Sequence, residues 1–346
     1  MLDKRNFELE HTRELQEKYR RDPALLERVL FAFGLLDALV QVELPFVFRG
    51  GTCLILLLSK PFRLSTDIDI TVAPGTDIDD YINKAAEIFP FISLEEQIRI
   101  GKNKIEKRHF KFKYRSPLMK REFYVLLDVL YAEMPYSKVI QQEVKNDLIL
   151  TSGQKSIVTV PELSCLLGDK LTAFAPHTTG ILLGVGKELE IIKQLFDIAV
   201  IFDEVDDFDL LSDVYQRTVL EELSYRGLAL SSEAVLSDSI NAAVCIISRG
   251  VLNKAEYAEY LFGIKGIGSH VLTMKYSGEI ASNQACKILY IASCLLSGTK
   301  VRKIANHENY LEQKIDSIKY RKLSYMKKQS IEAYSYLFEA IQMLDK

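Results

Sequence analysis

The sequence predicts an α+β fold in which a mixed β-sheet with flanking helices is followed by an all-helical domain. Between Phe46 and Tyr131, short β-rich runs alternate with stretches of helical periodicity. The run that begins at Glu122 is almost continuously apolar, as expected for a central strand. From Pro161 to Lys346, nearly every segment has apolar residues at helical spacing, separated by short glycine breaks.

Length and composition favour a soluble protein with two domains. A chain of 346 residues has enough material for two hydrophobic cores, and the change of pattern places the domains at 1–160 and 161–346. The formal net charge of -3 does not by itself indicate a nucleic-acid partner. Residues 1–21 are heavily charged and no apolar run is long enough to span a bilayer, so we expect a cytoplasmic protein without a membrane segment.

The elements of the first domain follow from periodicity and turn residues. Helical spacing extends from about Glu10 to Val42, with Asp22-Pro23 as a helix start. The expected elements after it are strand Phe46–Arg49, helix Thr52–Leu58, strand Ile68–Val72, helix Ile78–Phe89, a hairpin over Ile98–Tyr114 and strand Glu122–Tyr131. Cysteine and histidine residues are scattered without ligand spacing, so we expect buried, reduced thiols and no zinc site.

Two carboxylates, Asp67 and Asp69, belong to the strand around Ile68. Because successive side chains of a strand face opposite ways, both should project from one face while Ile68 and Ile70 enter the core. Two aligned carboxylates are suited to hard cations such as Mg²⁺.

A glycine turn precedes this strand. Gly50 and Gly51 allow a sharp bend and a close approach of the backbone to a ligand, and the helix that begins near Thr52 offers unsatisfied N–H groups. Such a helix start favours phosphate. An ordinary turn between a strand and a helix remains the alternative.

Two further charged residues occupy apolar surroundings. Asp128 lies in the middle of the apolar strand, where an unpaired charge is costly, so it needs a metal ion, a proton or backbone amides as partner. Lys170 falls on the apolar stripe of the helix after Pro161, and it either reaches solvent or points into a cleft between the domains.

In their order and spacing, the glycine turn and the Asp-x-Asp strand resemble nucleotidyltransferases of the DNA polymerase β type. The fuller string, Phe48-Arg-Gly-Gly-Thr followed by Arg63-Leu-Ser-Thr-Asp-Ile-Asp69, is similar to the AbiEii/AbiGii toxin family. That family's signature is a Lys- or Arg-Gly-Gly-Thr strand end followed by Arg-x-Ser-x-Asp-x-Asp.

The resemblance implies a polymerase β-type mixed sheet, a nucleoside triphosphate (NTP) as substrate and two Mg²⁺ ions as cofactors. It also implies a toxin with a separately encoded antitoxin, and in related toxins nucleotides are added to transfer RNA. The implied metal ligands are Asp67, Asp69 and Asp128. The implied catalytic residues are these three with Lys170 and Asp197, and the implied nucleotide-binding residues are Arg49, Gly50, Gly51, Thr52, Arg63 and Ser65.

Asp197 matches the last family motif incompletely, because Gln194 stands where the family often has an Asp and Ile198 follows Asp197. By periodicity, Lys193 and Asp197 are instead compatible with a surface pair. Arg49 and Arg63 suit phosphate oxygens but are also compatible with solvated ends of their segments, and Ser65 is compatible with shaping the turn.

Two basic segments are compatible with RNA binding or with plain solvation. The segment around the expected hairpin contains Lys102, Lys104, Lys107, Arg108, Lys111 and Lys113. The segment expected in the C-terminal helix contains Lys314, Lys319, Arg321, Lys322, Lys327 and Lys328, interleaved with Tyr320 and Tyr325.

The alternatives to a toxin are a small-molecule nucleotidyltransferase of the antibiotic-modifying sort and a catalytically silent nucleotide-binding module.

Overall fold

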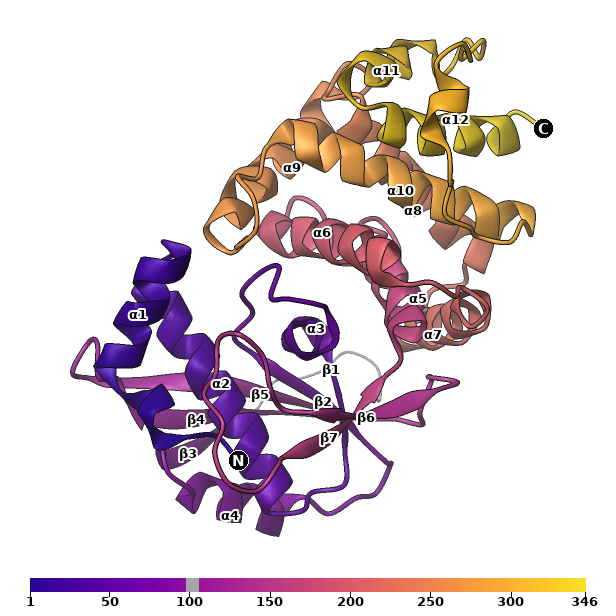
Figure 1. Ribbon diagram of the computed structural model, residues 1–346. Coiled ribbons are helices and arrows are strands. Elements are labelled where there is room, and N and C mark those ends of the chain that lie inside the picture. Colours follow the sequence, from indigo (N-terminus) through magenta and orange to yellow (C-terminus); the bar gives the residue numbers. More distant parts are fainter. Residues whose placement is uncertain (98–105) are drawn as a thin grey trace. The chain divides into compact units, whose positions relative to one another are not determined.

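The computed structural model describes residues 1–97 and 106–346 (Figure 1). The described chain divides into two compact units. The first consists of residues 1–162 together with 269–274, and the second consists of residues 163–268 together with 275–346. Each unit is described by itself below.

The first unit contains a five-stranded mixed sheet with the strand order β1-β2-β5-β4-β3. Strands β2 and β5 are parallel, and the other neighbouring pairs are antiparallel. The strands are β1 (Val47–Arg49), β2 (Ile68–Val72), β3 (Phe91–Gln97), β4 (Lys107–Arg115) and β5 (Glu122–Tyr131). A separate antiparallel pair is formed by β6 (Val139–Glu143) and β7 (Ile157–Pro161).

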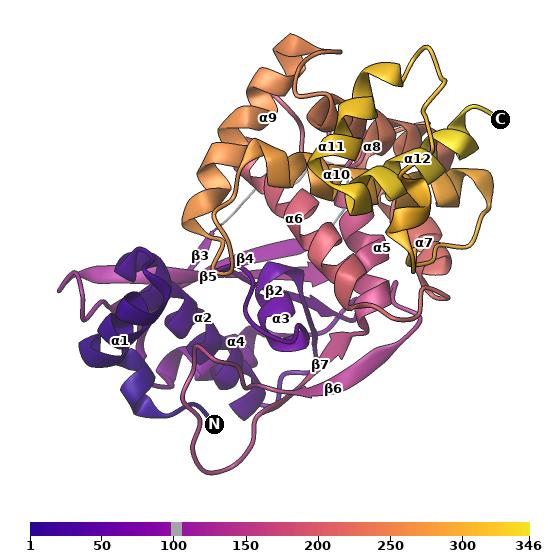
Figure 2. The same cartoon turned by 45° about the horizontal axis from the view of Figure 1, so that its top comes forward.

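The helices of this unit are η1 (Lys4–Phe7), α1 (Leu9–Tyr19), α2 (Pro23–Gln41), α3 (Gly50–Leu57) and α4 (Asp79–Glu87). Helices α2 and α4 contact one face of the sheet (Figures 1 and 2). Alternate side chains on that face are buried, and the ring of Tyr114 in β4 stacks on that of Phe31 in α2 at 3.6 Å between centroids. The remaining side chains of β4 and β5 lie on the opposite face, which carries the candidate site.

The described residues of the second unit form helices joined by turns and loops, without a β-strand. Its helices are α5 (Leu163–Ala173), α6 (Glu188–Glu204), α7 (Leu211–Arg226), α8 (Ser232–Ile247), α9 (Lys254–Gly266), α10 (Gly278–Ser297), α11 (Met326–Gln329) and α12 (Ile331–Leu344), with 3₁₀ turns η2 (Ile267–Ser269), η3 (His307–Tyr310) and η4 (Arg321–Tyr325). Several begin where a side chain caps the first turn, among them Ser231, Asn253, Ser277 and Ser330.

This architecture confirms the predicted α+β class. Asp22 caps α2 as expected, and Ile68 and Ile70 are fully buried. Strand β5 lies centrally between β2 and β4, but its burial alternates, because only one of its faces packs against helix α2. The predicted hairpin begins too late, because its first strand is β3 at Phe91–Gln97 and the connection lies outside the described residues.

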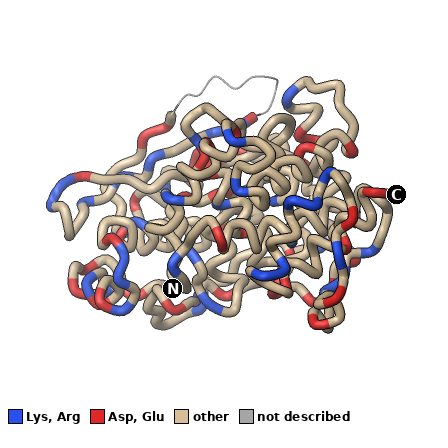
Figure 3. The backbone as a smooth tube through the Cα atoms, turned by 90° about the horizontal axis from the view of Figure 1, so that it is seen from above, with Lys and Arg blue, Asp and Glu red and all other residues tan. Residues whose placement is uncertain are grey.

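The five cysteines are all buried, as predicted. Among the described residues, no helix combines the length and the apolar character needed to cross a bilayer. Basic and acidic residues are interspersed along the backbone in the view of Figure 3, in keeping with the small net charge.

Candidate active site

A transverse row of polar residues crosses the sheet of the first unit. The register pairs Arg49 of β1 with Asp69 of β2, Asp69 with Asp128 of β5, Asp128 with His109 of β4, and His109 with Gln97 of β3. Directly paired residues of adjacent strands project from the same face. The sheet therefore brings Asp69 and Asp128 to neighbouring positions on the face opposite α2.

Gly50 places the main chain directly against Asp69. Its φ is +82°, a conformation that glycine adopts without penalty, and a Cβ there would lie 2.1 Å from Oδ2 of Asp69. The turn between β1 and α3 is thus packed against the carboxylate. Only glycine fits at this position.

Gly51 makes room for two more predicted residues. A Cβ there would lie 2.6 Å from the Arg63 guanidinium and 2.8 Å from Oγ of Ser65. The space at the glycine pair, which the sequence predicted as room for a ligand, therefore holds side chains of Asp69, Arg63 and Ser65. Six predicted residues meet here, counting Thr52, the third residue of α3, whose hydroxyl donates to the carbonyl of Asp67 over 2.6 Å.

The loop that carries Arg63 is fixed by a segment distant in the sequence. Residues 269–274 belong to the first unit, and Val271 forms an antiparallel bridge with Arg63. Leu64 N–H donates to the carbonyl of His270 over 2.9 Å, and Leu272 N–H donates to that of Phe62 over 2.8 Å. Arg63 is 6% exposed, so its orientation is set by this packing.

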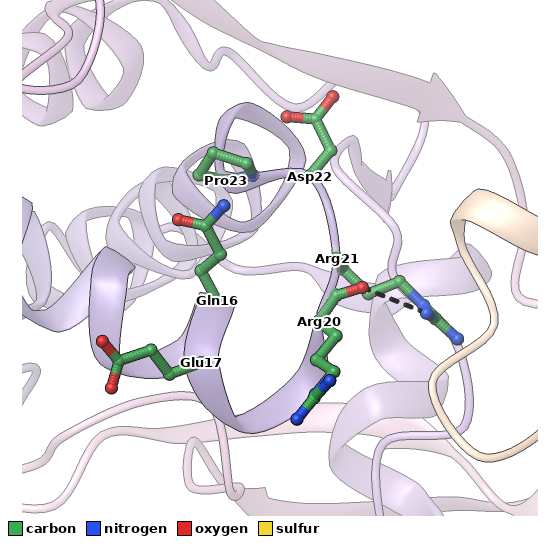
Figure 4. A pocket seen from close by; sticks show the side chains of 6 residues that line it. All are labelled: Gln16, Glu17, Arg20, Arg21, Asp22 and Pro23. Atoms are coloured by element: carbon green, nitrogen blue, oxygen red, sulfur yellow. Dashed lines mark hydrogen bonds between the residues drawn. The ribbon is translucent and has the colours of Figure 1, made fainter.

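The same segment is anchored from the turn between α1 and α2. Arg21 Nε donates to the carbonyl of Val271 over 2.7 Å, and Arg21 also donates to the carbonyl of Arg20, as Figure 4 shows. A depression of about 640 Å³ lies at this turn. Its lining residues include none of the predicted site residues and are Gln16, Glu17, Arg20, Arg21, Asp22 and Pro23.

Asp67 directly precedes strand β2 and lies beside Arg28 of helix α2. Strand β2 begins at Ile68, so the alternation of a strand does not fix the direction of the Asp67 side chain. Its Oδ1 lies 3.9 Å from the guanidinium of Arg28 in α2, and the Thr66 hydroxyl is 3.4 Å from the same oxygen. The structure therefore brings Asp69 and Asp128 together, while Asp67 adjoins Arg28.

Asp128 has a partner other than the backbone amides considered from the sequence. Nδ1 of His109 lies 2.6 Å from Oδ1 of Asp128. The two side chains are 13% and 33% exposed. A carboxylate accepts, so Nδ1 carries the proton.

The carboxylates fit a hard divalent cation in part. Within residues 1–97 and 106–346, no three His, Cys, Asp or Glu side chains are grouped as they stand to hold a metal ion. Mg²⁺ usually keeps several waters and uses one or two carboxylates together with substrate phosphates. Asp69 and Asp128 lie on adjacent strands beside the Gly50 turn, and their carboxylate oxygens can supply these protein ligands.

Lys170 and Asp197 form a buried ion pair within the second unit. Lys170 Nζ, in α5, lies 2.8 Å from Oδ2 of Asp197, in α6, and the side chains are 7% and 2% exposed. Lys170 also donates to Gln194 over 3.2 Å, whereas Lys193 pairs with Glu190. The predicted surface pair of Lys193 and Asp197 is wrong, because Asp197 points into the core of this unit.

The structure gives little support for RNA binding by the two basic segments. Lys111 and Lys113 pair with Glu95, and Arg108 with Glu96 and Asp79. The C-terminal group lies mainly on the 3₁₀ turn η4 and short α11 rather than in one helix, and Tyr320 is buried. Lys102 and Lys104 lie outside the described residues.

Sequence reasoning missed two residues that contact the predicted carboxylates, His109 and Arg28. His109 alternates with lysines in β4, and only the strand register places it beside Asp128. Arg28 lies in α2, whose apolar pattern indicates packing, and its guanidinium lies 5.7 Å from the ring centroid of Phe123. Neither position belongs to a local motif.

A glycine turn between a strand and a helix, beside paired carboxylates on a mixed sheet, is the arrangement of a nucleotidyltransferase. The family described as "Nucleotidyl transferase AbiEii toxin, Type IV TA system" matches residues 34–261, which is more than half of the chain. The chain belongs to this family, so it is a toxin-type nucleotidyltransferase, as the resemblance of the short motifs implied. The family implies a nucleotide substrate and an antitoxin partner.

Two solved structures are similar to the chain. JHP933 from Helicobacter pylori has a TM-score of 0.47 and 14% identity, with 79% of this chain and 93% of that chain covered. A second H. pylori structure, described as a nucleotidyltransferase, has a TM-score of 0.45 and 14% identity, with 79% of this chain and 96% of that chain covered. Among curated proteins, none matches the chain.

Proposed function

We propose that this enzyme transfers a nucleoside monophosphate from an NTP to a hydroxyl acceptor in a reaction that depends on Mg²⁺. The acceptor oxygen forms a bond to the α-phosphorus, the bond to the pyrophosphate breaks, and the hydroxyl loses its proton. The observation that carries the proposal is the pairing of Asp69 with Asp128 beside Gly50.

The first unit supplies the metal ligands and the phosphate contacts. Asp69 and Asp128, together with Asp67, would hold Mg²⁺. The bound ions, two by analogy with other nucleotidyl transfer sites, supply positive charge that activates the attacking hydroxyl and neutralises the triphosphate. Arg63, Ser65 and the amides at the start of α3 would orient the phosphates, with Arg49 beside them.

The second unit contributes the Lys170–Asp197 pair to the proposal. Lys170 is proposed to add positive charge at the transferring phosphate, and Asp197 is proposed to hold its ammonium group in place. The support is geometric, because Nζ of Lys170 lies 2.8 Å from Oδ2 of Asp197 and both side chains are buried.

The proposed acceptor is an RNA, with transfer RNA as the first candidate, and the proposed regulator is a separately encoded antitoxin. Both follow from the family resemblance, and the basic segments add little because acidic neighbours pair with several of their members. A small-molecule acceptor and a silent nucleotide-binding role make different predictions for the experiment below.

The test supplies each labelled NTP with Mg²⁺ and offers either total RNA or small hydroxyl-bearing acceptors. Label in RNA with release of pyrophosphate supports the proposal. Label in a small acceptor alone would indicate the antibiotic-modifying alternative. Nucleotide binding without pyrophosphate release from any mixture would contradict transfer.

A further inference from the structure

The closest polar contact of the proposed metal ligand Asp128 comes from a histidine on the neighbouring strand. His109 and Asp128 are directly paired in the register of β4 and β5, with 2.6 Å between Nδ1 and Oδ1. Within the part of the chain that the structure describes, His109 is the one hydrogen-bonding partner found for the Asp128 side chain. The contact is therefore the main polar restraint on this carboxylate.

The surroundings of Asp128 make this restraint important. Along β5, the residues two positions before and after it on the same face are Leu126 and Leu130, which offer no hydrogen bond from their side chains. The carboxylate is one-third exposed and could rotate about its side-chain bonds without His109. A charge-assisted hydrogen bond of this length selects one orientation.

The hydrogen bond from His109 occupies one carboxylate oxygen of Asp128 and leaves the second oxygen available for a cation. Because the ionised carboxylate can only accept, the imidazole donates from Nδ1 to Oδ1, and Oδ2 keeps its lone pairs. Hydrogen bonds from outer residues orient the carboxylates that bind metal ions, and their loss typically weakens metal affinity.

We propose that His109 is a positioning residue of this enzyme, which fixes the Asp128 carboxylate so that its second oxygen binds the divalent cation shared with Asp69. The inference rests on the proposed function, and it adds a residue outside the family motifs. His109 acts through Asp128 and need not contact the nucleotide.

The test measures Mn²⁺ affinity of the metal-stripped full chain, from the free-ion signal in electron paramagnetic resonance, together with thermal unfolding. His109→Leu removes the donor, and we expect the dissociation constant to rise about 10- to 100-fold. His109→Asn keeps an N–H donor at the δ position, and we expect it to restore most of the affinity.

Two comparisons separate positioning from folding. His11, a buried histidine of α1 whose Nε2 lies 2.9 Å from the carbonyl of Leu148, provides the matched control His11→Leu, which should change the unfolding temperature and leave Mn²⁺ affinity unaltered. In an Asp128→Asn background, His109→Leu should weaken binding no further, because the two residues act as one unit.

The outcomes distinguish the role of His109 from the proposed function. Wild-type affinity in His109→Leu, alongside weakened binding in Asp69→Asn and Asp128→Asn, would overturn the role of His109 and leave the metal site intact. That role is also overturned if His109→Asn binds as poorly as His109→Leu while both unfold at the wild-type temperature. Absence of Mn²⁺ binding by the wild-type protein would overturn the metal site and the role of His109 together.

Discussion

Asp69 and Asp128 occupy directly paired positions on the parallel strands β2 and β5, and Oδ2 of Asp69 lies 2.1 Å from the place that a Cβ of residue 50 would take. The glycine turn and the carboxylates are therefore parts of one packed structure. This relationship explains why the turn sequence and the Asp-x-Asp sequence occur together. It also predicts which substitutions should change cation binding and which should not.

Removal of one carboxylate should reduce cation binding without unfolding the protein. Asp69→Asn and Asp128→Asn are expected to weaken Mn²⁺ binding by more than about tenfold, since loss of an outer partner already costs that much. Isothermal titration calorimetry measures this directly. Asp80→Asn changes an exposed carboxylate of α4 in the same unit and should bind normally. Equal affinity in all three variants would contradict the assignment of the ligands.

Gly50→Ala should disturb the site more than its backbone strain alone explains. The positive φ costs about 1–2 kcal/mol for a residue with a Cβ, and the Cβ would also displace Asp69. Gly75→Ala is the matched control, because its φ is +78° and no atom lies within 4 Å of the added Cβ. Chemical denaturation should show a loss in both variants, whereas metal affinity should fall only in Gly50→Ala. An equal fall in the metal affinity of Gly75→Ala would contradict this interpretation.

The Lys170–Asp197 pair allows stability to be separated from catalysis. Lys170→Met alone removes the cationic partner of a buried carboxylate, so we expect about 3–5 kcal/mol of destabilisation. Lys170→Met with Asp197→Leu should recover most of that stability, because both charges are gone. Nucleotide transfer should remain lost in the double variant, and its recovery would show that the pair is only structural.

The β3–β4 hairpin should lose part of its stability in acid. Hydrogen bonds from Arg108 hold the pKa of Glu96 below its usual value of 4.5. A lowered carboxyl pKa stabilises the fold above about pH 4.5, and this contribution disappears as the pH falls through the folded-state pKa. Solvent screening limits it to less than about 1 kcal/mol. The unfolding temperatures of the wild type and Glu96→Gln should differ at pH 7 and converge near pH 3, and an equal difference at both pH values would contradict this account.

Much of the fold was predictable because it follows local pattern. Ile68 and Ile70 alternate with polar residues, Asp22-Pro23 begins a helix, and the helical spacing after Pro161 is sustained. The β3 strand was missed because its exposed, charged residues, such as Glu95 and Glu96, lack an apolar alternation. Its pairing with β4 is a tertiary property.

The site was predictable where one segment supplies both members of a contact. Gly50, Gly51, Arg63, Ser65 and Asp69 lie within one motif and meet in space. The bridge from Val271 to Arg63 and the contact of His109 with Asp128 both join segments that are distant in the sequence. A local sequence pattern does not reveal such pairing. The contact of Asp67 with Arg28 of α2 likewise joins segments that are distant in the sequence.

Covalent transfer of labelled nucleotide is the most direct test of the proposed mechanism. The wild-type protein, incubated with each α-phosphate-labelled NTP, Mg²⁺ and total RNA, should incorporate label and release pyrophosphate, and the double variant Asp67→Ala with Asp69→Ala should do neither. Transfer by the double variant at the wild-type rate would contradict the role of these carboxylates, and with it the mechanism.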